Sequence, residues 1–322
     1  MNPLTELAEY EELNRDLNRG KGPVQISGCM DSQKVHLMWE AGETLPWKLV
    51  VTYDDSRAKE IYEDFQCFTD AVWLYPAKDL LFYNADIHGN LITRERMQVL
   101  RHLIEEKSGV VVTTIDGLMD HLLPLSMVES QILTVSQGEV IDIEEWRKRL
   151  VSLGYERMAQ VDGMGQFSIR GGIVDIFPLT EELPVRIELW VDSIRSFDPE
   201  SQRSVEQLEE VVLYPATEIV LTPEQVEMGL ERITKSEKSY EKTLREQFQT
   251  EEAHRIRSII EEFKENLKDG MATGSLDSYL TYFCQDTVSF AEYFPAEETA
   301  VFLDEPIRLK ERGEAVETEF RE

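Results

Sequence analysis

The chain has 322 residues, of which 42% are hydrophobic and 9% aromatic, and this is enough for two or three domains with cores of their own. Its formal net charge of −30 argues against autonomous binding to DNA or RNA, which needs clustered Lys and Arg, although acidity alone identifies no partner. Three widely spaced cysteines and the lack of a long apolar run exclude a disulfide framework and a membrane span, so we expect a cytoplasmic protein.

Strands and helices alternate over the first part of the chain. A polar helix over residues 1–20 ends at a Gly- and Pro-containing segment. After it, the expected strands are 24–27, 49–53, 72–75 and 110–113, and the expected helices are 35–41, 57–65, 94–106 and 116–122. Asp55 or Ser56 is expected to cap the second of these helices and Thr93 the third, after a surface loop over 84–90. Such alternation is typical of a parallel sheet with helices on both faces.

The pattern changes after Pro124. A helix over 143–153 is expected between a capping Asp142 and Gly154, and short strands follow up to Pro215. Beyond them, residues 222–267 and 275–292 are expected to be helical, 300–303 to form a strand that rejoins the first sheet, and 307–322 to form a charged helix. We therefore predict an N-terminal helix over 1–24, a sheet domain over 25–127, an inserted α+β domain over 128–216, and a mostly helical part over 217–322 that ends in a connector helix.

A segment between an expected strand and an expected helix has the context of a phosphate-binding P-loop. Gly28 and Lys34 have the spacing of G-x-x-x-x-G-K-[ST], but Gln33 replaces the second glycine and Val35 the hydroxyl residue that binds magnesium. Asp31 places a negative charge where phosphates would lie. The segment therefore predicts a degenerate P-loop without a working nucleotide site.

Two further patterns bear on catalysis. VFLDEP, residues 301–306, has the form of a strand ending in the acidic pair of a Walker B motif, whose carboxylates hold magnesium in helicase-like ATPases. Without a competent P-loop, Asp304 and Glu305 are expected to be relics that cap or solvate the strand end. The five histidines have no metal-ligand spacing, so we predict neither a metal site nor a catalytic residue.

Residues 165–215 carry charges in unusual places. In VRIELWV, residues 185–191, strict alternation places Arg186 and Trp190 on one outward face, and in FSIR it places Arg170 outward before a Gly-Gly turn. Arginine and tryptophan on an exposed sheet face match the composition of protein-binding hot spots. The alternative is that Arg186 pairs with Glu188 and that Trp190 lies against an adjacent element.

Three stretches resemble a known family. FSIRGGIVDIFPLTEELPVRIELWVDSIRSFDPESQRS resembles the second domain of the excision-repair protein UvrB and, more closely, the matching domain of bacterial transcription-repair coupling factors (Mfd). YPAKDLLFYNADIHGNLITRERMQVLRHL and YFPAEETAVFLDEP resemble the first domain of the same family. UvrB has an intact P-loop and coupling factors do not, so the degenerate P-loop favours the coupling factors.

The resemblance implies a non-enzymatic recruitment module. Its fold class would be α/β, with a discontinuous helicase-like parallel sheet domain and an inserted domain that binds UvrA through Arg170, Arg186 and Trp190. RNA polymerase and DNA would be bound, and ATP and magnesium held, by domains beyond Glu322, so no cofactor is expected here. Two alternatives are the N-terminal part of a UvrB-like ATPase and an autoinhibitory scaffold module with no external partner.

Overall fold

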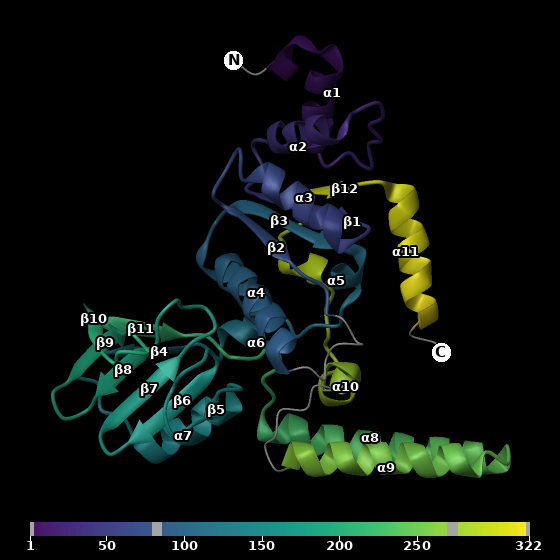
Figure 1. The fold of residues 1–322 in the computed structure, drawn as a ribbon. Helices are drawn as coiled ribbons and strands as arrows, with labels where there is room; N and C mark the ends of the chain where they lie inside the picture. Colours follow the sequence, from purple (N-terminus) through teal and green to yellow (C-terminus); the bar gives the residue numbers. More distant parts are fainter. Residues whose placement is uncertain (1–2, 79–85, 269–275, 320–322) are drawn as a thin grey trace. The chain divides into compact units, whose positions relative to one another are not determined.

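The computed structural model describes residues 3–78, 86–268 and 276–319. The chain divides into two compact units, one built from residues 1–79, 99–120 and 289–322 and the other from residues 80–98 and 121–288 (Figure 1). Across the described residues, no helix combines the length and the hydrophobicity needed to cross a membrane.

The first unit is built on a parallel sheet. Its strands lie in the order β12-β1-β3-β2, and their bounds are β1 (Trp47–Thr52), β2 (Val72–Tyr75), β3 (Gly109–Thr114) and β12 (Thr299–Leu303). All six residues of β1 are buried, as expected for a strand that is covered on both faces. The predicted return of the chain is confirmed, because β12 pairs in parallel with β1 and brings Val301 opposite Leu49.

The first unit also contains several helices. They are η1 (Pro3–Glu6), α1 (Ala8–Leu17), α2 (Asp31–Glu40), α3 (Asp55–Phe65), α5 (Ile115–Met119), η2 (Phe290–Tyr293) and α11 (Pro306–Glu319). Apolar side chains from α2 and α3, among them Val35, Ile61 and Phe65, pack with Val50 and Val112 of the central strands. This packing fixes the start of α2 at the carboxyl end of the sheet, where the degenerate P-loop lies.

Several predicted elements of the first unit are wrong at their ends. Residues 24–27 form no strand, and α2 begins at Asp31, four residues before the predicted start. Asp54, not Asp55 or Ser56, caps α3 by accepting a hydrogen bond from the Arg57 N–H at 2.7 Å. Asp54, Asp55 and Ser56 all have side-chain oxygens that could cap the free N–H groups of the first helical turn, so the sequence alone does not choose among them. The backbone conformation decides which residue caps the helix.

The helix predicted over 94–106 begins much earlier, as α4 (Asp86–Glu105). The predicted loop over 84–90 is helical from Asp86 onward, its first two residues lie outside the described part, and Thr93 lies within the helix instead of capping it. Gly89 and Asn90 are poor helix formers, but the buried Met97 and Leu100 anchor the helix by packing. Tertiary burial has here overridden a local turn signal.

The second unit contains a six-stranded sheet of the predicted inserted domain, which is antiparallel except for one parallel pair at its edge. Its strands lie in the order β10-β9-β8-β7-β6-β5, with bounds β5 (Glu156–Arg157), β6 (Gln166–Arg170), β7 (Ile173–Phe177), β8 (Val185–Glu188), β9 (Ser193–Phe197) and β10 (Ser204–Leu208). One face packs against α7 (Ile143–Ser152), β4 (Leu133–Ser136) and β11 (Glu210–Leu213) through a single apolar cluster. As predicted, Asp142 caps α7, and Gly154 follows its end with φ +86°.

The remainder of this unit is helical. Its helices are α6 (Leu125–Glu129), α8 (Pro223–Glu246), α9 (Thr250–Lys268) and α10 (Leu276–Phe283). α8 and α9 lie side by side (Figure 1), and α8 begins at a capping box of Thr222 and Gln225. α10 ends earlier than the helix predicted over 275–292. The α/β fold class, with a parallel sheet and an added antiparallel domain, is confirmed.

Candidate functional site

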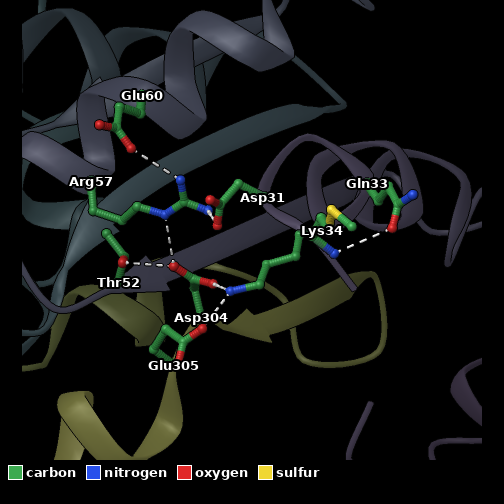
Figure 2. Close-up of polar contacts among 9 residues, drawn as sticks. Asp31, Gln33, Lys34, Thr52, Arg57, Glu60, Asp304 and Glu305 are labelled. Carbon is green, nitrogen blue, oxygen red and sulfur yellow. Dashed lines mark hydrogen bonds and ion pairs between the residues drawn. The ribbon is translucent and has the colours of Figure 1, made fainter. Parts of the chain in front are cut away.

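The degenerate P-loop lies in the first unit, immediately before α2. Gly28 is exposed and has φ +85°, a conformation that favours glycine. The Gln33 side chain folds back and accepts a hydrogen bond from the Met30 N–H at 3.2 Å (Figure 2). Val35 is fully buried in the core. The two positions that depart from the P-loop pattern therefore serve to cap and anchor the helix.

Lys34 reaches across to the acidic pair at the end of β12. Its Nζ donates to Asp304 Oδ1 at 2.9 Å and to Glu305 Oε1 at 2.5 Å (Figure 2). Burial lowers the pKa of the Lys34 ammonium, but the hydrogen bonds to the two carboxylates outweigh burial, and the pKa is raised overall. The lysine that a P-loop directs at phosphate is thus held by protein carboxylates.

Asp304 is the centre of this cluster, with a side chain only 1% exposed. Its Oδ2 accepts from Thr52 Oγ1 and from Arg57 Nε, each at 3.1 Å. Arg57 also pairs with Glu60 at 3.0 Å and with Asp31 at 3.4 Å. Burial raises the pKa of Asp304, but the hydrogen bonds from Lys34 and Arg57 prevail and lower it. Both oxygens of the carboxylate are therefore taken by protein donors, which leaves it poorly placed to ligate magnesium.

The sequence did not point to Arg57 or Thr52. A usable signal was present, because Thr52 ends β1, Arg57 lies in the first turn of α3 just after it, and the carboxyl ends of neighbouring parallel strands meet at one edge of a sheet. Among the described residues, no group of three His, Cys, Asp or Glu side chains gathers as metal ligands would.

A second cluster lies on the face of the antiparallel sheet that is opposite its core. Asp175 of β7 is only 1% exposed and stands in register with Ser168 of β6 and Arg186 of β8. Arg186 holds both of its oxygens, with Nε to Oδ1 at 2.6 Å and a terminal nitrogen to Oδ2 at 2.9 Å. Arg170 donates to Oδ2 at 2.8 Å. The structure therefore joins two of the predicted partner-binding residues through a shared carboxylate.

These two arginines differ in how accessible they are. The Arg186 side chain is 11% exposed, donates also to Gln202 Oε1 at 2.8 Å, and lies over the Phe197 ring at 4.4 Å. The hydrogen bonds to Asp175 raise the pKa of Arg186 despite burial. Arg170, in contrast, is 48% exposed. The alternative pairing of Arg186 with Glu188 is wrong, since Glu188 pairs with Arg195 at 2.9 Å.

Trp190 does not lie on a strand. β8 ends at Glu188, and Leu189–Asp192 form the turn that leads into β9, so the strict alternation predicted for residues 185–191 ends at Glu188, and Val191 is exposed. The indole lies on Gly172, where a Cβ would stand only 1.8 Å from its Nε1, and it is 83% exposed. Gly172 belongs to the turn that follows Arg170 at the end of β6, so Trp190 and the exposed arginine lie at the same end of these strands.

Comparison with known proteins addresses this second cluster directly. Residues 133–219 match the family model of the UvrB interaction domain, and they include Arg170, Asp175, Arg186 and Trp190. The chain is 31% identical over 325 residues to the transcription-repair-coupling factor of Bacillus subtilis (strain 168) and 30% identical over 327 residues to that of Staphylococcus aureus (strain Mu50). The resemblance to transcription-repair coupling factors is confirmed.

The coupling-factor resemblance has a defined extent. Each alignment covers 99% of this chain but only 27% of the Bacillus subtilis protein and 28% of the Staphylococcus aureus protein. The similarity therefore includes both units, and both the degenerate P-loop and the face around Asp175 lie within it. The chain spans about a quarter of the length of the coupling factors that it matches.

Proposed function

We propose that this chain is a non-catalytic recruitment module of transcription-coupled DNA repair, and that its domain of residues 133–219 binds UvrA. The observation that carries the proposal is that Trp190, which is 83% exposed, and Arg170, which is half-exposed, lie at the same end of the sheet within the segment that matches the UvrB interaction domain. A large aromatic side chain left in solvent costs hydrophobic free energy, and such residues with a neighbouring arginine dominate protein interfaces.

The chemistry of this face suits a protein partner. Trp190 offers a rigid apolar surface at low cost in conformational entropy, and Arg170 offers a planar fork that matches a carboxylate. Exposure of both residues also favours binding over the alternative of a scaffold module with no external partner.

The absence of catalysis in the proposal rests on the first unit. Lys34 and Arg57 neutralise Asp304 internally, and Gln33 and Val35 are committed to the start and the core of α2. A working ATPase site needs the lysine free for phosphate and the carboxylate free for metal-bound water. These contacts disfavour the alternative of a UvrB-like ATPase, and we propose that the chain needs no cofactor.

Other partners would act through other parts of a longer protein. The chain corresponds to only 27% of the Bacillus subtilis relative. In the proposal, RNA polymerase and DNA bind outside this chain, and an ATP-driven motor with its magnesium also lies there. This module would then supply the contact that brings the excision machinery to the site.

The test is calorimetric titration of the chain with purified UvrA from the same organism. We expect saturable binding to the wild-type chain. Trp190→Ala should weaken it by about 2 kcal/mol, roughly 30-fold in Kd, as truncation of an interface anchor does. Because Trp190 is exposed, the melting temperature of the Trp190→Ala variant should equal that of the wild-type chain.

Phe248→Ala provides the matched control. Phe248 is 93% exposed in the turn between α8 and α9. This substitution therefore also removes an exposed aromatic ring, but one outside residues 133–219. It should leave UvrA binding unchanged. Absence of binding by the wild-type chain would sink the proposal, and equal losses in the two variants would show that the contact is not specific to the Trp190 face.

A further inference from the structure

We infer that Asp175 is the positioning residue of the proposed UvrA-binding face, and that Arg170 presents the positive charge to the partner while Arg186 acts only through Asp175. The inference rests on the proposed function and assigns a separate role to each charged residue of the face. It differs from the expectation that Arg170, Arg186 and Trp190 all contact the partner directly.

Asp175 cannot itself be the contact, because its carboxylate is buried at 1% exposure. A buried carboxylate without partners is strongly disfavoured, and this one is satisfied by three hydrogen bonds from Arg170 and Arg186. It lies on the central strand β7, which pairs with β6 and β8 on either side. The anion is therefore fixed by the sheet, and the two arginines take their positions from it.

Arg186 has little surface left to offer a partner, because its side chain is only 11% exposed. Its Nε and one terminal nitrogen are bonded to Asp175, and the same terminal nitrogen donates to Gln202. Gln202 has φ +59° and is itself held by the bond from its amide nitrogen to the Pro199 carbonyl at 2.7 Å. Together with the Phe197 ring beneath the guanidinium, these contacts hold Arg186 within the sheet face.

Arg170 is placed differently. Within the described residues, its side chain has a hydrogen bond to Asp175 through one terminal nitrogen and remains 48% exposed. The other donors of its guanidinium fork are available for a contact outside the chain. Two arginines share one carboxylate, so the cluster keeps one positive charge in excess within a chain of net charge −30. The chemistry that fits this end of the sheet is a partner carboxylate on Arg170 next to an apolar surface on Trp190.

The test is a double-mutant cycle on UvrA binding. Arg170→Ala should weaken binding by about tenfold or more, as loss of one partner of a charge pair does. Asp175→Asn keeps the shape of the side chain and removes the anion, and it should cost a similar factor when Arg170 is present. If Asp175 acts through Arg170, the same change should cost almost nothing in the Arg170→Ala background.

Two further variants keep the cycle decisive. Glu145→Gln on α7 removes one negative charge from the opposite side of the sheet and should change binding little in either background. If Asp175→Asn does not fold, Arg186→Gln replaces it, and its effect should likewise require Arg170. Losses that simply add in the cycle would overturn the inference while leaving UvrA binding, and hence the proposed function, in place.

A measurement on the free chain separates the two ideas. Arginine side-chain NMR should show a restrained guanidinium for Arg186 in the wild-type chain and in Glu145→Gln, but not in Asp175→Asn. An unrestrained Arg186 in the wild-type chain would also overturn the inference. A restrained Arg186 in a chain that does not bind UvrA would overturn the proposed function instead.

Discussion

Asp304 shows how one buried carboxylate can be neutralised entirely by protein side chains. Lys34 and Arg57 approach it from two sides and supply, from the protein itself, positive charge of the kind that a magnesium ion supplies in an ATPase. Thr52 donates a third hydrogen bond to it. The cluster is therefore a structural ion-pair network at the carboxyl end of the sheet.

At the residue scale, the network predicts a large effect of Asp304→Asn on stability. The change leaves Lys34 and Arg57 with a neutral partner in a largely buried site, and it should lower the free energy of unfolding by about 3 kcal/mol. Urea unfolding is the measurement. Glu60→Gln removes a carboxylate from the same arginine, but Glu60 is 65% exposed, so it should cost less than about 1 kcal/mol. Equal effects of the two variants would contradict a buried role for Asp304.

The stability difference between the wild-type chain and Asp304→Asn should also depend on pH. The pKa of Asp304 is lowered in the folded chain relative to its ordinary value of 3.8. A group of this kind contributes stability that is fully present above 3.8 and is lost as the pH falls through its folded pKa. The difference in unfolding free energy between the wild-type chain and Asp304→Asn should therefore be constant near neutral pH and shrink below pH 3.8. A constant difference in acid would show that the carboxylate is not responsible.

At the scale of elements, the contacts of α2 with the end of β12 determine whether Lys34 could be released to bind a phosphate. Gln33 caps the first turn of α2 and Val35 packs in the core beneath it. The lysine between them is bonded to Asp304 and Glu305, the two residues that follow β12. Restoring the P-loop residues at positions 33 and 35 alone therefore does not break the bonds from Lys34 to the two carboxylates.

We therefore predict that the chain binds neither ATP nor ADP with magnesium, and that Gln33→Gly combined with Val35→Thr does not restore binding. Val35→Thr alone should also destabilise the chain, because it buries a hydroxyl in an apolar cluster. Calorimetric titration with nucleotide should show no saturable heat for the wild-type chain or the double variant. Micromolar binding by the wild-type chain would revive the ATPase alternative.

At the scale of the whole molecule, the dominant property is the net charge of −30. Long-range repulsion from phosphates opposes approach to DNA, and the exposed guanidinium of Arg170 is too small a patch to offset it. We predict no mobility shift of duplex DNA at moderate salt with the chain near micromolar concentration. A shift that weakens steeply as salt increases would show a basic surface that the sequence does not reveal.

Local sequence patterns were sufficient for several elements. The strand over 72–75, the helix that Asp142 caps and the strand at 300–303 that rejoins the first sheet follow from periodicity, capping chemistry and burial along a few consecutive residues. The loss of the P-loop pattern at Gln33 and Val35 is likewise legible in the sequence. The contacts that these two side chains make cannot be predicted from the sequence, because they depend on what α2 packs against.

The sequence by itself determined the fold class, the family resemblance and the identity of the exposed arginine and tryptophan. Only the tertiary structure decided that Arg57 would meet Asp304, 247 residues away, and that Asp175 would hold Arg170 and Arg186 together. Alternation along one strand reports which side chains share a face. It does not report which strand lies beside it, and ion pairs across a sheet depend on that neighbour.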